Sequence, residues 1–253
     1  MERESSPRDK LRAVGAGIGI GVGGLLLGGV LTLCAILLVR AFIDIGPAEL
    51  IVLSLLMTQG IGLGSAAVAY LRWRGVGLEY ISARVPSLSD LVWVVVAYVV
   101  ALGGVWLVGV LVTLADAPTA ENQVTDIAIE NPEVLLVLIP GSFLLIGPGE
   151  ELLFRGIVQA RIREAFGPVP GVTIASVIFA AVHFVALSGG ASGRLVTVGV
   201  LLVPSLVLGA AYEYTGNLAV PALIHGAYNA TLFTALYAVI RYGDGLPESA
   251  ALI

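Results

Sequence analysis

The chain has 253 residues, of which 58% are hydrophobic and only 12% are charged, and its formal net charge is −5. About a quarter of the residues of a soluble domain are charged, so this composition excludes an ordinary soluble globular protein. The chain is predicted to be an integral membrane protein in contact with membrane lipids, and no nucleic-acid partner is expected.

Apolar runs long enough to cross about 30 Å of hydrocarbon, at about 1.5 Å per helical residue, recur along the whole chain. The predicted fold is an all-α, polytopic transmembrane helix bundle with seven to eight spans. An eighth element at 151–166 has the pattern of an amphipathic continuation of the fourth span. Five runs are long enough: Ala13–Val39, Leu50–Leu71, Leu91–Ala115, Leu195–Tyr212 and, with one histidine allowed, Leu218–Ile240. Two more segments qualify with interruptions: Val134–Gly149, which runs into the paired glutamates, and Val172–Leu187, which carries His183.

The first run contains the stretch GAGIGIGVGG, in which Gly15, Gly19 and Gly23 recur every fourth residue. Such a face of small residues predicts the close approach of a second helix. Gly19, Gly21 and Gly24 also match GxGxxG, but a dinucleotide-binding loop needs a preceding strand and a following helix. Packing is therefore the favoured interpretation of these glycines.

Basic residues cluster in three places, which predicts the orientation in the membrane. They are Arg3, Arg8, Lys10 and Arg12 at the N-terminus, Arg72, Arg74 and Arg84 after the second span, and Arg155, Arg161 and Arg163 after the fourth. The connection at 116–133 has no Lys or Arg and carries five acidic residues. The positive-inside rule then places the N-terminus and 155–170 in the cytoplasm, and the acidic connection and the C-terminus outside.

The chain shows no internal repeat, and its connections are too short for a soluble domain, so one integral membrane domain is expected. Residues 1–128 hold N-terminal spans without motifs, whereas 129–240 hold the spans that carry polar residues. Pro140 and the sequence Gly147-Pro148-Gly149 predict a kinked or broken fourth helix. A broken helix at membrane depth is tolerated where it lines a cavity.

The stretch GPGEELLFRG at 147–156 places three ionisable side chains in a very apolar part of the chain. Glu151 and Arg155, four residues apart on one helical face, are predicted to form a buried structural ion pair. Glu150 lies about 100° around the helix and has no local partner. It is the candidate general base. The alternative is a second structural contact, or a side chain that reaches the cytoplasmic boundary.

Both histidines of the chain lie inside predicted spans, where polar groups tend to face a bundle interior and pair with one another. Phe179 and His183 stand four residues apart, so the phenyl ring is expected to pack beside the imidazole. His225 and Asn229 repeat this spacing. Each pair alone is also compatible with a structural role, such as a polar clamp between helices. Together with Glu150 they supply the groups that activate water and stabilise an oxyanion.

Three motifs thus follow one another on successive apolar helices: Glu150-Glu151-x3-Arg155, Phe179-x3-His183 and His225-x3-Asn229. Over roughly residues 130–235 this ordered set resembles the CPBP family of intramembrane proteases, the CAAX-prenyl-endopeptidase and bacteriocin-processing group. The resemblance implies an all-helical endopeptidase with an active site in the bilayer that opens to the cytoplasm. It also implies a hydrophobic or prenylated peptide or protein substrate.

The resemblance assigns a role to each motif residue. Glu150 would deprotonate the attacking water, and His183 would help to hold it. His225 and Asn229 would donate to the oxyanion, an assignment that the amide donor of Asn supports. The supporting residues would be Glu151, Arg155 and Phe179.

Whether a metal takes part is left open by the sequence. The family was long described as metalloproteases, and Glu150, His183 and His225 form a set that Zn²⁺ accepts. However, the chain has no HExxH helix, and its two histidines lie on different helices. Metal-free chemistry, with no cofactor required, is preferred slightly over a single zinc ion.

Two other classes of function are compatible with these residues. The first is a non-catalytic membrane scaffold or immunity protein, in which the polar residues are structural. The second is a proton-coupled transporter, in which Glu150 and the histidines form a proton relay. The transporter requires polar groups in both halves of the chain, and the first half is interpreted as offering none. The oligomeric state is not predicted.

Overall fold

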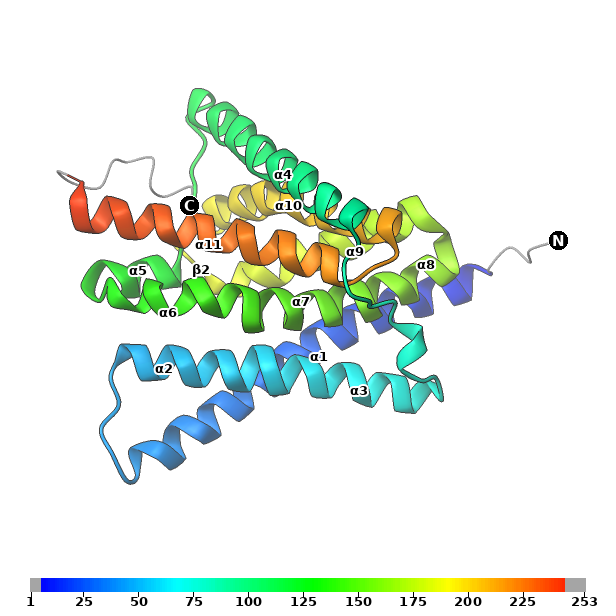
Figure 1. Ribbon diagram of the computed structural model, residues 1–253, viewed down its shortest axis with the longest axis horizontal. Coiled ribbons are helices and arrows are strands. Elements are labelled where there is room, and N and C mark those ends of the chain that lie inside the picture. Colours follow the sequence, from blue (N-terminus) through cyan, green and yellow to red (C-terminus); the bar gives the residue numbers. More distant parts are fainter. Residues whose placement is uncertain (1–5, 244–253) are drawn as a thin grey trace.

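The computed structural model describes residues 6–243, which form a bundle of long helices (Figure 1). In this part of the chain, seven helices are long and apolar enough to cross a membrane. They are α1 (Pro7–Arg40), the continuous α2–α3 (Pro47–Arg74), α4 (Leu88–Leu114), the continuous α6–α8 (Glu133–Phe166), α9 with its following turn (Pro168–Ala186), α10 (Ala191–Thr215) and α11 (Ala219–Tyr242). The predicted all-α membrane bundle is confirmed. Residues 151–166 continue the fourth span and do not form an eighth.

Of the kinked or broken fourth helix that was predicted, the break is not found: the span continues through its prolines. Two π-helical segments, Ser142–Ile146 and Phe154–Gln159, join α6 (Glu133–Gly141), α7 (Gly147–Leu153) and α8 (Ala160–Phe166) into one helix. The wider π turns accommodate the irregularity without interrupting the helix, and such turns are frequent at functional sites. The second span contains a similar segment at Leu55–Gly62, between α2 (Pro47–Ser54) and α3 (Leu63–Arg74).

The glycine face of α1 that packs against the bundle is not the predicted one. Gly15, Gly19 and Gly23 are exposed, and nothing lies within 4 Å of the position that a Cβ would take. A Cβ at Gly28 would instead stand 2.8 Å from the backbone of Thr58. The stretch contains glycines on two faces, and the four-residue spacing alone does not say which face is buried. The buried glycines are Gly17, Gly21, Gly24 and Gly28.

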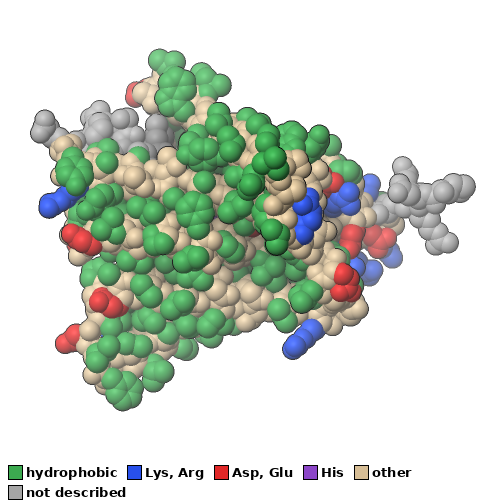
Figure 2. Space-filling model, viewed as in Figure 1, with side chains coloured by type: hydrophobic (Ala, Val, Ile, Leu, Met, Phe, Trp, Pro, Cys, Tyr) green, Lys and Arg blue, Asp and Glu red, His purple; other side chains and the backbone are tan. Residues whose placement is uncertain are grey.

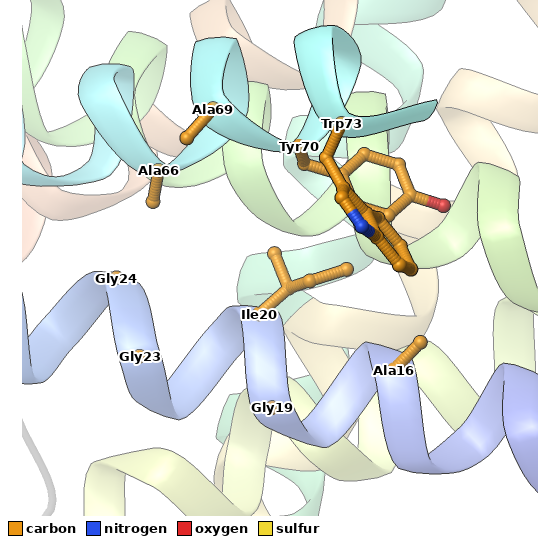
Figure 3. A pocket seen from close by; sticks show the side chains of 9 residues that line it. All are labelled: Ala16, Gly19, Ile20, Gly23, Gly24, Ala66, Ala69, Tyr70 and Trp73. Carbon is orange, nitrogen blue, oxygen red and sulfur yellow. The ribbon is translucent and has the colours of Figure 1, made fainter. Parts of the chain in front are cut away.

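The exposed glycine face forms one side of an apolar groove of about 420 Å³ between α1 and α3 (Figure 3). Tyr70 and Trp73 lie on the opposite side, and Trp73 is 77% exposed. The residues that line this groove include no carboxylate, imidazole or thiol. It is therefore not a candidate catalytic site.

The two ends of the bundle differ in charge, and Figure 2 shows Lys and Arg gathered mainly at one of them. We call this the Arg-rich end: its basic residues are Arg8, Lys10, Arg12, Arg72, Arg74, Arg84, Arg161 and Arg163, and its acidic residues are Asp9, Glu79, Asp90, Glu164 and Glu213. At the opposite, acidic end, the basic residues are Arg40, Arg194 and Arg241, and the acidic residues are Asp44, Glu49, Asp116, Glu121, Asp126, Glu130 and Glu133. Arg3 and the C-terminal segment 244–253 lie outside the described residues.

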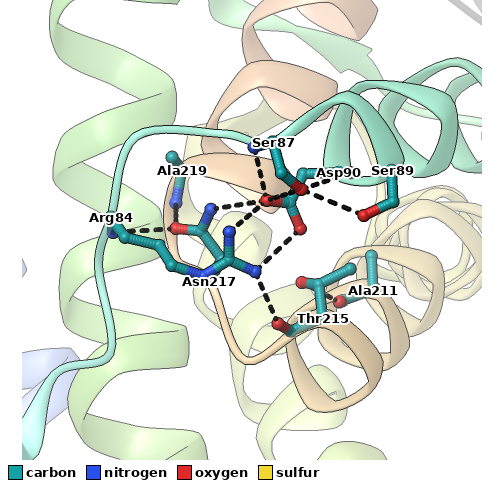
Figure 4. Close-up of polar contacts among 8 residues, drawn as sticks. All are labelled: Arg84, Ser87, Ser89, Asp90, Ala211, Thr215, Asn217 and Ala219. Atoms are coloured by element: carbon teal, nitrogen blue, oxygen red, sulfur yellow. Dashed lines mark hydrogen bonds and ion pairs between the residues drawn. The ribbon is translucent and has the colours of Figure 1, made fainter.

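At the Arg-rich end, the connection 75–87 is held against the turn between α10 and α11 by a polar network (Figure 4). Asp90 is buried and forms an ion pair with Arg84, and its Oδ2 accepts the Ser87 backbone N–H at 2.8 Å. Asn217 is fully buried, and its Oδ1 accepts the Arg84 backbone N–H at 3.0 Å. Because the buried polar side chains are hydrogen-bonded, the network fixes the connection in place.

At the acidic end, the connection 116–133 is structured. β1 (Glu121–Asn122) pairs antiparallel with β2 (Leu187–Ser188), and α5 (Gln123–Glu130) follows β1 directly. The Asn122 side chain accepts the Val124 N–H at 2.9 Å and so caps the N-terminus of α5. This short strand pair and helix cover part of the acidic end.

Candidate active site

Glu150, on α7, faces both imidazoles of the chain. Its Oε2 is 4.0 Å from Nε2 of His183, which follows α9 (Pro168–Val182), and 3.9 Å from Nε2 of His225 on α11. This oxygen is buried and has no hydrogen-bond partner within residues 6–243. A buried carboxylate oxygen without a partner is costly. The site is therefore built to receive a hydrogen-bond donor or a cation between these three side chains.

Both imidazoles present the same nitrogen to Glu150. Nδ1 of His183 lies 2.7 Å from the carbonyl oxygen of Phe179, and Nδ1 of His225 lies 2.8 Å from Oε1 of Glu151. A carbonyl or an ionised carboxylate only accepts, so each Nδ1 carries a proton and donates it. In the neutral imidazole Nε2 is then an acceptor. Three acceptors consequently converge at one point, where a water molecule can donate to two of them and a metal cation can bind all three.

The predicted ion pair between Glu151 and Arg155 is confirmed. Arg155 Nε donates to Glu151 Oε2 at 2.9 Å, and neither side chain is exposed. The remaining guanidinium nitrogens donate to Ser205 Oγ at 3.0 Å and to Ser176 Oγ at 3.4 Å. Since the other carboxylate oxygen of Glu151 binds His225, the ion pair also orients that imidazole.

Phe179 packs beside His183 as predicted, with 4.7 Å between the ring centroids. The same phenyl ring lies 4.9 Å from the guanidinium carbon of Arg155, in cation–π geometry, and 5.9 Å from the His225 ring. Phe179 thus separates the buried cation from the two imidazoles and restricts the orientation of each. This arrangement is consistent with the supporting role that the motif comparison assigns to it.

Glu150, His183 and His225 line a cavity of about 410 Å³. Asn229 stands one turn after His225 on α11 and lines this cavity too. Its carboxamide can therefore donate to a group bound in the cavity. Most of the other lining side chains are apolar and come from α2, α6, α10 and α11, among them Ile51, Leu55, Leu138, Val200, Leu201, Leu232, Phe233 and Leu236. Such a lining suits an apolar ligand with a few fixed polar contacts.

The cavity extends from Glu150 toward the acidic end, where Asn122 of β1 and Leu187 of β2 line it. α1 begins at the Arg-rich end, as Figure 1 shows. The start of α1 and the part of the cavity lined by Asn122 and Leu187 therefore lie at opposite ends of the bundle. The cytoplasmic opening of the site stays a prediction.

Gln59, from the second span, is the site residue that the sequence analysis missed. Its Nε2 donates to Glu150 Oε1 at 2.8 Å. The contact depends on a close approach of two helices, because the Gln59 carbonyl lies where a Cβ at Gly149 would stand. The interpretation that the first half offers no polar group was therefore wrong. An uncharged amide within an apolar run, which is itself uncommon, was the available signal.

We expect Gln59→Met to lower kcat for a reaction catalysed by Glu150 with KM close to wild type, and to lower the thermal midpoint, because Glu150 Oε1 then lies buried without its donor. A hydrogen bond to a charged group contributes about 1.5–3 kcal/mol, which corresponds to roughly a 10- to 100-fold change in rate. Loss of the hydrogen bond from Gln59 leaves the Glu150 carboxylate free to rotate.

The measurement is a double-mutant comparison of Gln59→Met, Glu150→Gln and the combined variant. If Gln59 acts through Glu150, the combined variant is no slower than Glu150→Gln alone. Additive losses would show that Gln59 acts elsewhere.

Comparison with known families bears on this geometry. Residues 132–231 match the family model described as type II CAAX prenyl endopeptidase Rce1-like. These residues, about two fifths of the chain, are therefore similar to that family. This match confirms the resemblance drawn from the three motifs. It includes every motif residue from Glu150 to Asn229 and leaves Gln59 outside.

The chain is also similar to an uncharacterised protein, YpbD, of Bacillus subtilis (strain 168). The two are 44% identical over 82 residues, which is 32% of this chain and 36% of YpbD. The match thus covers about a third of either protein. No solved structure matches the chain.

Proposed function

We propose that the protein is an intramembrane endopeptidase in which Glu150 activates water to hydrolyse a peptide bond. The observation that carries this proposal is the buried, unpaired Oε2 of Glu150 within 4.0 Å of two imidazole nitrogens. The similarity to the Rce1-like family supports it, because that family is named for endopeptidases. The site geometry then gives each side chain a distinct task.

A water held at this point donates one hydrogen bond to Glu150 and another to an imidazole Nε2. Glu150 takes its proton as the oxygen adds to the substrate carbonyl carbon. Asn229, and His225 when it carries a second proton, donate to the resulting oxyanion. The proton then passes from Glu150 to the departing nitrogen, the C–N bond breaks, and a carboxylate and an amine are released.

One carboxylate and two imidazoles are also ligand types that a divalent metal ion accepts. Glu150, His183 and His225 would hold the ion, and each Nδ1 already donates to an oxygen, as is usual for metal-bound histidine. Ligands around tetrahedral zinc stand roughly 3.3 Å apart, which is closer than the 3.9 Å and 4.0 Å found here. Within residues 6–243 no group of three such side chains has metal-binding geometry. When bound, the ion would supply a Lewis acid that activates water.

We propose a hydrophobic or prenylated peptide, or the hydrophobic segment of a membrane protein, as the substrate. The support is the cavity, whose lining is mostly aliphatic and aromatic, with Gln59, His183, His225 and Asn229 beside Glu150 and a few further polar side chains, such as Asn122 and Thr197, toward the acidic end. An apolar substrate loses little on entering such a lining, whereas a charged one would be desolvated without a partner.

We also propose that the Arg-rich end, with the N-terminus, faces the cytoplasm. Within residues 6–243, the charges named above sum to +3 at that end (8 − 5) and −4 at the acidic end (3 − 7). The positive-inside rule counts Lys and Arg near the ends of spans, and the difference of eight against three is large.

Purified protein incubated with lipidated and unlipidated peptide panels, and analysed by mass spectrometry, tests the proposed activity. We expect cleavage of apolar or lipidated peptides that continues in the presence of a strong chelator. Activity that is lost with chelator and restored by zinc would assign the same residues to metal-assisted hydrolysis. If no peptide is cleaved by folded protein, the scaffold alternative is favoured instead.

A further inference from the structure

The apolar groove between α1 and α3 lies at the surface of the bundle and shares no lining residue with the cavity beside Glu150 (Figure 3). On α1 the groove extends from Ala16 to Gly24, and on α3 from Ala66 to Trp73. Eight residues of helix rise about 12 Å, which is less than the roughly 15 Å of hydrocarbon in one leaflet. Because α1 begins and α3 ends at the Arg-rich end, the groove lies within the leaflet at that end.

Both walls of the groove are fixed in place. Gly19 has no side chain to fill it, and nothing lies within 4 Å of the position that its Cβ would take. The opposite wall is aromatic, with 6.0 Å between the ring centroids of Tyr70 and Trp73. Arg74 Nη1 donates to the Tyr70 hydroxyl at 3.0 Å and to Glu164 of α8 at 3.3 Å, so this wall is tied to the fourth span. A preformed apolar hollow is typical of a ligand site.

The mouth of the groove at the Arg-rich end is positively charged. Arg12 stands one turn before Ala16 on α1, and Arg72 directly precedes Trp73 on α3. Both arginines are exposed, and in the part of the chain that the structure describes neither forms an ion pair, whereas four other arginines at this end do. Trp73 is 77% exposed in the last turn of its helix, a position at which tryptophan marks the level of the lipid headgroups.

We infer that the groove binds an anionic phospholipid of this leaflet, with one acyl chain along α1 and the phosphate held by Arg12 and Arg72. Charge complementarity selects this class of lipid, since Arg8 and Lys10 add to the charge of Arg12, and the acidic residue beside them on α1 is Asp9. The inference goes beyond the proposed peptidase and does not depend on it.

The shape of the groove favours an acyl chain over a helix of a second copy or of another protein. A helix with its side chains is about 10–12 Å across, whereas the groove encloses only about 420 Å³. Trp73 also reaches from α3 toward α1 near Ala16, where it would obstruct a straight helix (Figure 3). An acyl chain is thinner and can bend around the indole ring.

Native mass spectrometry of the purified full chain, after incubation with a lipid mixture in detergent, tests the headgroup. The mixture contains equal amounts of dioleoylphosphatidylglycerol and dioleoylphosphatidylcholine, which differ only in the headgroup. We expect the wild type to retain phosphatidylglycerol preferentially. Arg12→Gln and Arg72→Gln should each weaken this retention about five-fold, the usual contribution of one cation near a membrane surface. Arg40→Gln, at the opposite end of α1, is the matched control and should behave like the wild type.

Filling the groove tests the position of the acyl chain. Gly19→Leu places a side chain in the groove, and Gly29→Leu makes the same change on the same helix outside it. No atom lies within 4 Å of either Cβ position, so both variants should keep the wild-type thermal midpoint. We expect Gly19→Leu to lose the retained phosphatidylglycerol and Gly29→Leu to keep it. As a second measurement, phosphatidylglycerol with a diazirine in its acyl chain should cross-link the wild type within 16–24 or 66–73.

Three results would overturn the inference: equal retention of both lipids by the wild type, unchanged retention by Gly19→Leu, or cross-links spread over all lipid-facing helices. A wild-type dimer that Gly19→Leu abolishes, with no lipid retained, would overturn it in favour of a second copy in the groove. None of these measurements involves hydrolysis, so their outcome is separate from that of the proposed activity.

Discussion

Replacing Glu150 by glutamine is expected to reduce kcat for peptide hydrolysis by about 10²- to 10⁴-fold, the usual contribution of a general base. The folded protein should persist, because the new carbonyl oxygen can still accept the hydrogen bond from Gln59 Nε2. The amide has no basic oxygen to take a proton from water. Steady-state cleavage of a peptide substrate, together with the thermal midpoint in detergent, measures both consequences.

Glu133→Gln is the matched control for this variant. It makes the same change on the same membrane-spanning helix, at an exposed position outside the cavity. Its activity should equal that of the wild type. Glu150→Gln protein that cleaves at the wild-type rate would remove the general base from the account, and Glu150→Gln protein that fails to fold would indicate a structural carboxylate.

Replacing Arg155 by methionine is expected to destabilise the protein by about 3–5 kcal/mol, because it leaves the Glu151 charge buried without its cation. Neither side chain of this pair has any exposed surface. Ser176 and Ser205 would also lose the guanidinium that they contact. The thermal midpoint in detergent, and the yield of monodisperse protein, report this loss.

Arg163→Met provides the comparison for Arg155→Met. Arg163 lies on the same span, pairs with Glu213 at 2.7 Å and has a side chain that is 54% exposed. An exposed ion pair contributes about 0–1 kcal/mol, so this variant should be close to wild type in stability. Equal stabilities for the two variants would show that the buried ion pair is not what holds the site together.

The four-residue spacings in the sequence predicted local contacts well. Glu151 with Arg155, and Phe179 with His183, are in contact as their four-residue spacing predicted. The contacts form although Arg155 lies in a π-helical segment and His183 follows the end of α9. The convergence of Glu150 with both imidazoles was also predicted, from the cost of leaving ionisable groups isolated in hydrocarbon.

Contacts that depend on how helices are placed against one another were not predictable in this way. Gln59 meets Glu150 only because a π-helical segment approaches Gly149 closely. The buried face of α1 contains Gly24 and Gly28, but the exposed face also carries glycines four residues apart. The spacing of the glycines therefore did not indicate which face of α1 is buried. The hydrogen bond between His225 and Glu151 joins residues on separate spans, so no local spacing indicates it.

Pro140 and Pro148 predicted a kinked or broken fourth helix, and π-helical segments allow the helix to continue through them without a break. Which part of the bundle is filled by Leu153, Phe154 and Ile157 was not predictable either, because side-chain packing of this kind is a tertiary property.

The central claim is that Glu150, supported by the two imidazoles, makes water the nucleophile. Cleavage of one apolar peptide in H₂¹⁸O by wild-type and Glu150→Gln protein tests it most directly, with mass spectrometry of the fragments. We predict one ¹⁸O atom in the new C-terminal carboxylate of the wild-type product and no detectable product from Glu150→Gln. Fragments without ¹⁸O, or equal product from both proteins, would contradict the claim.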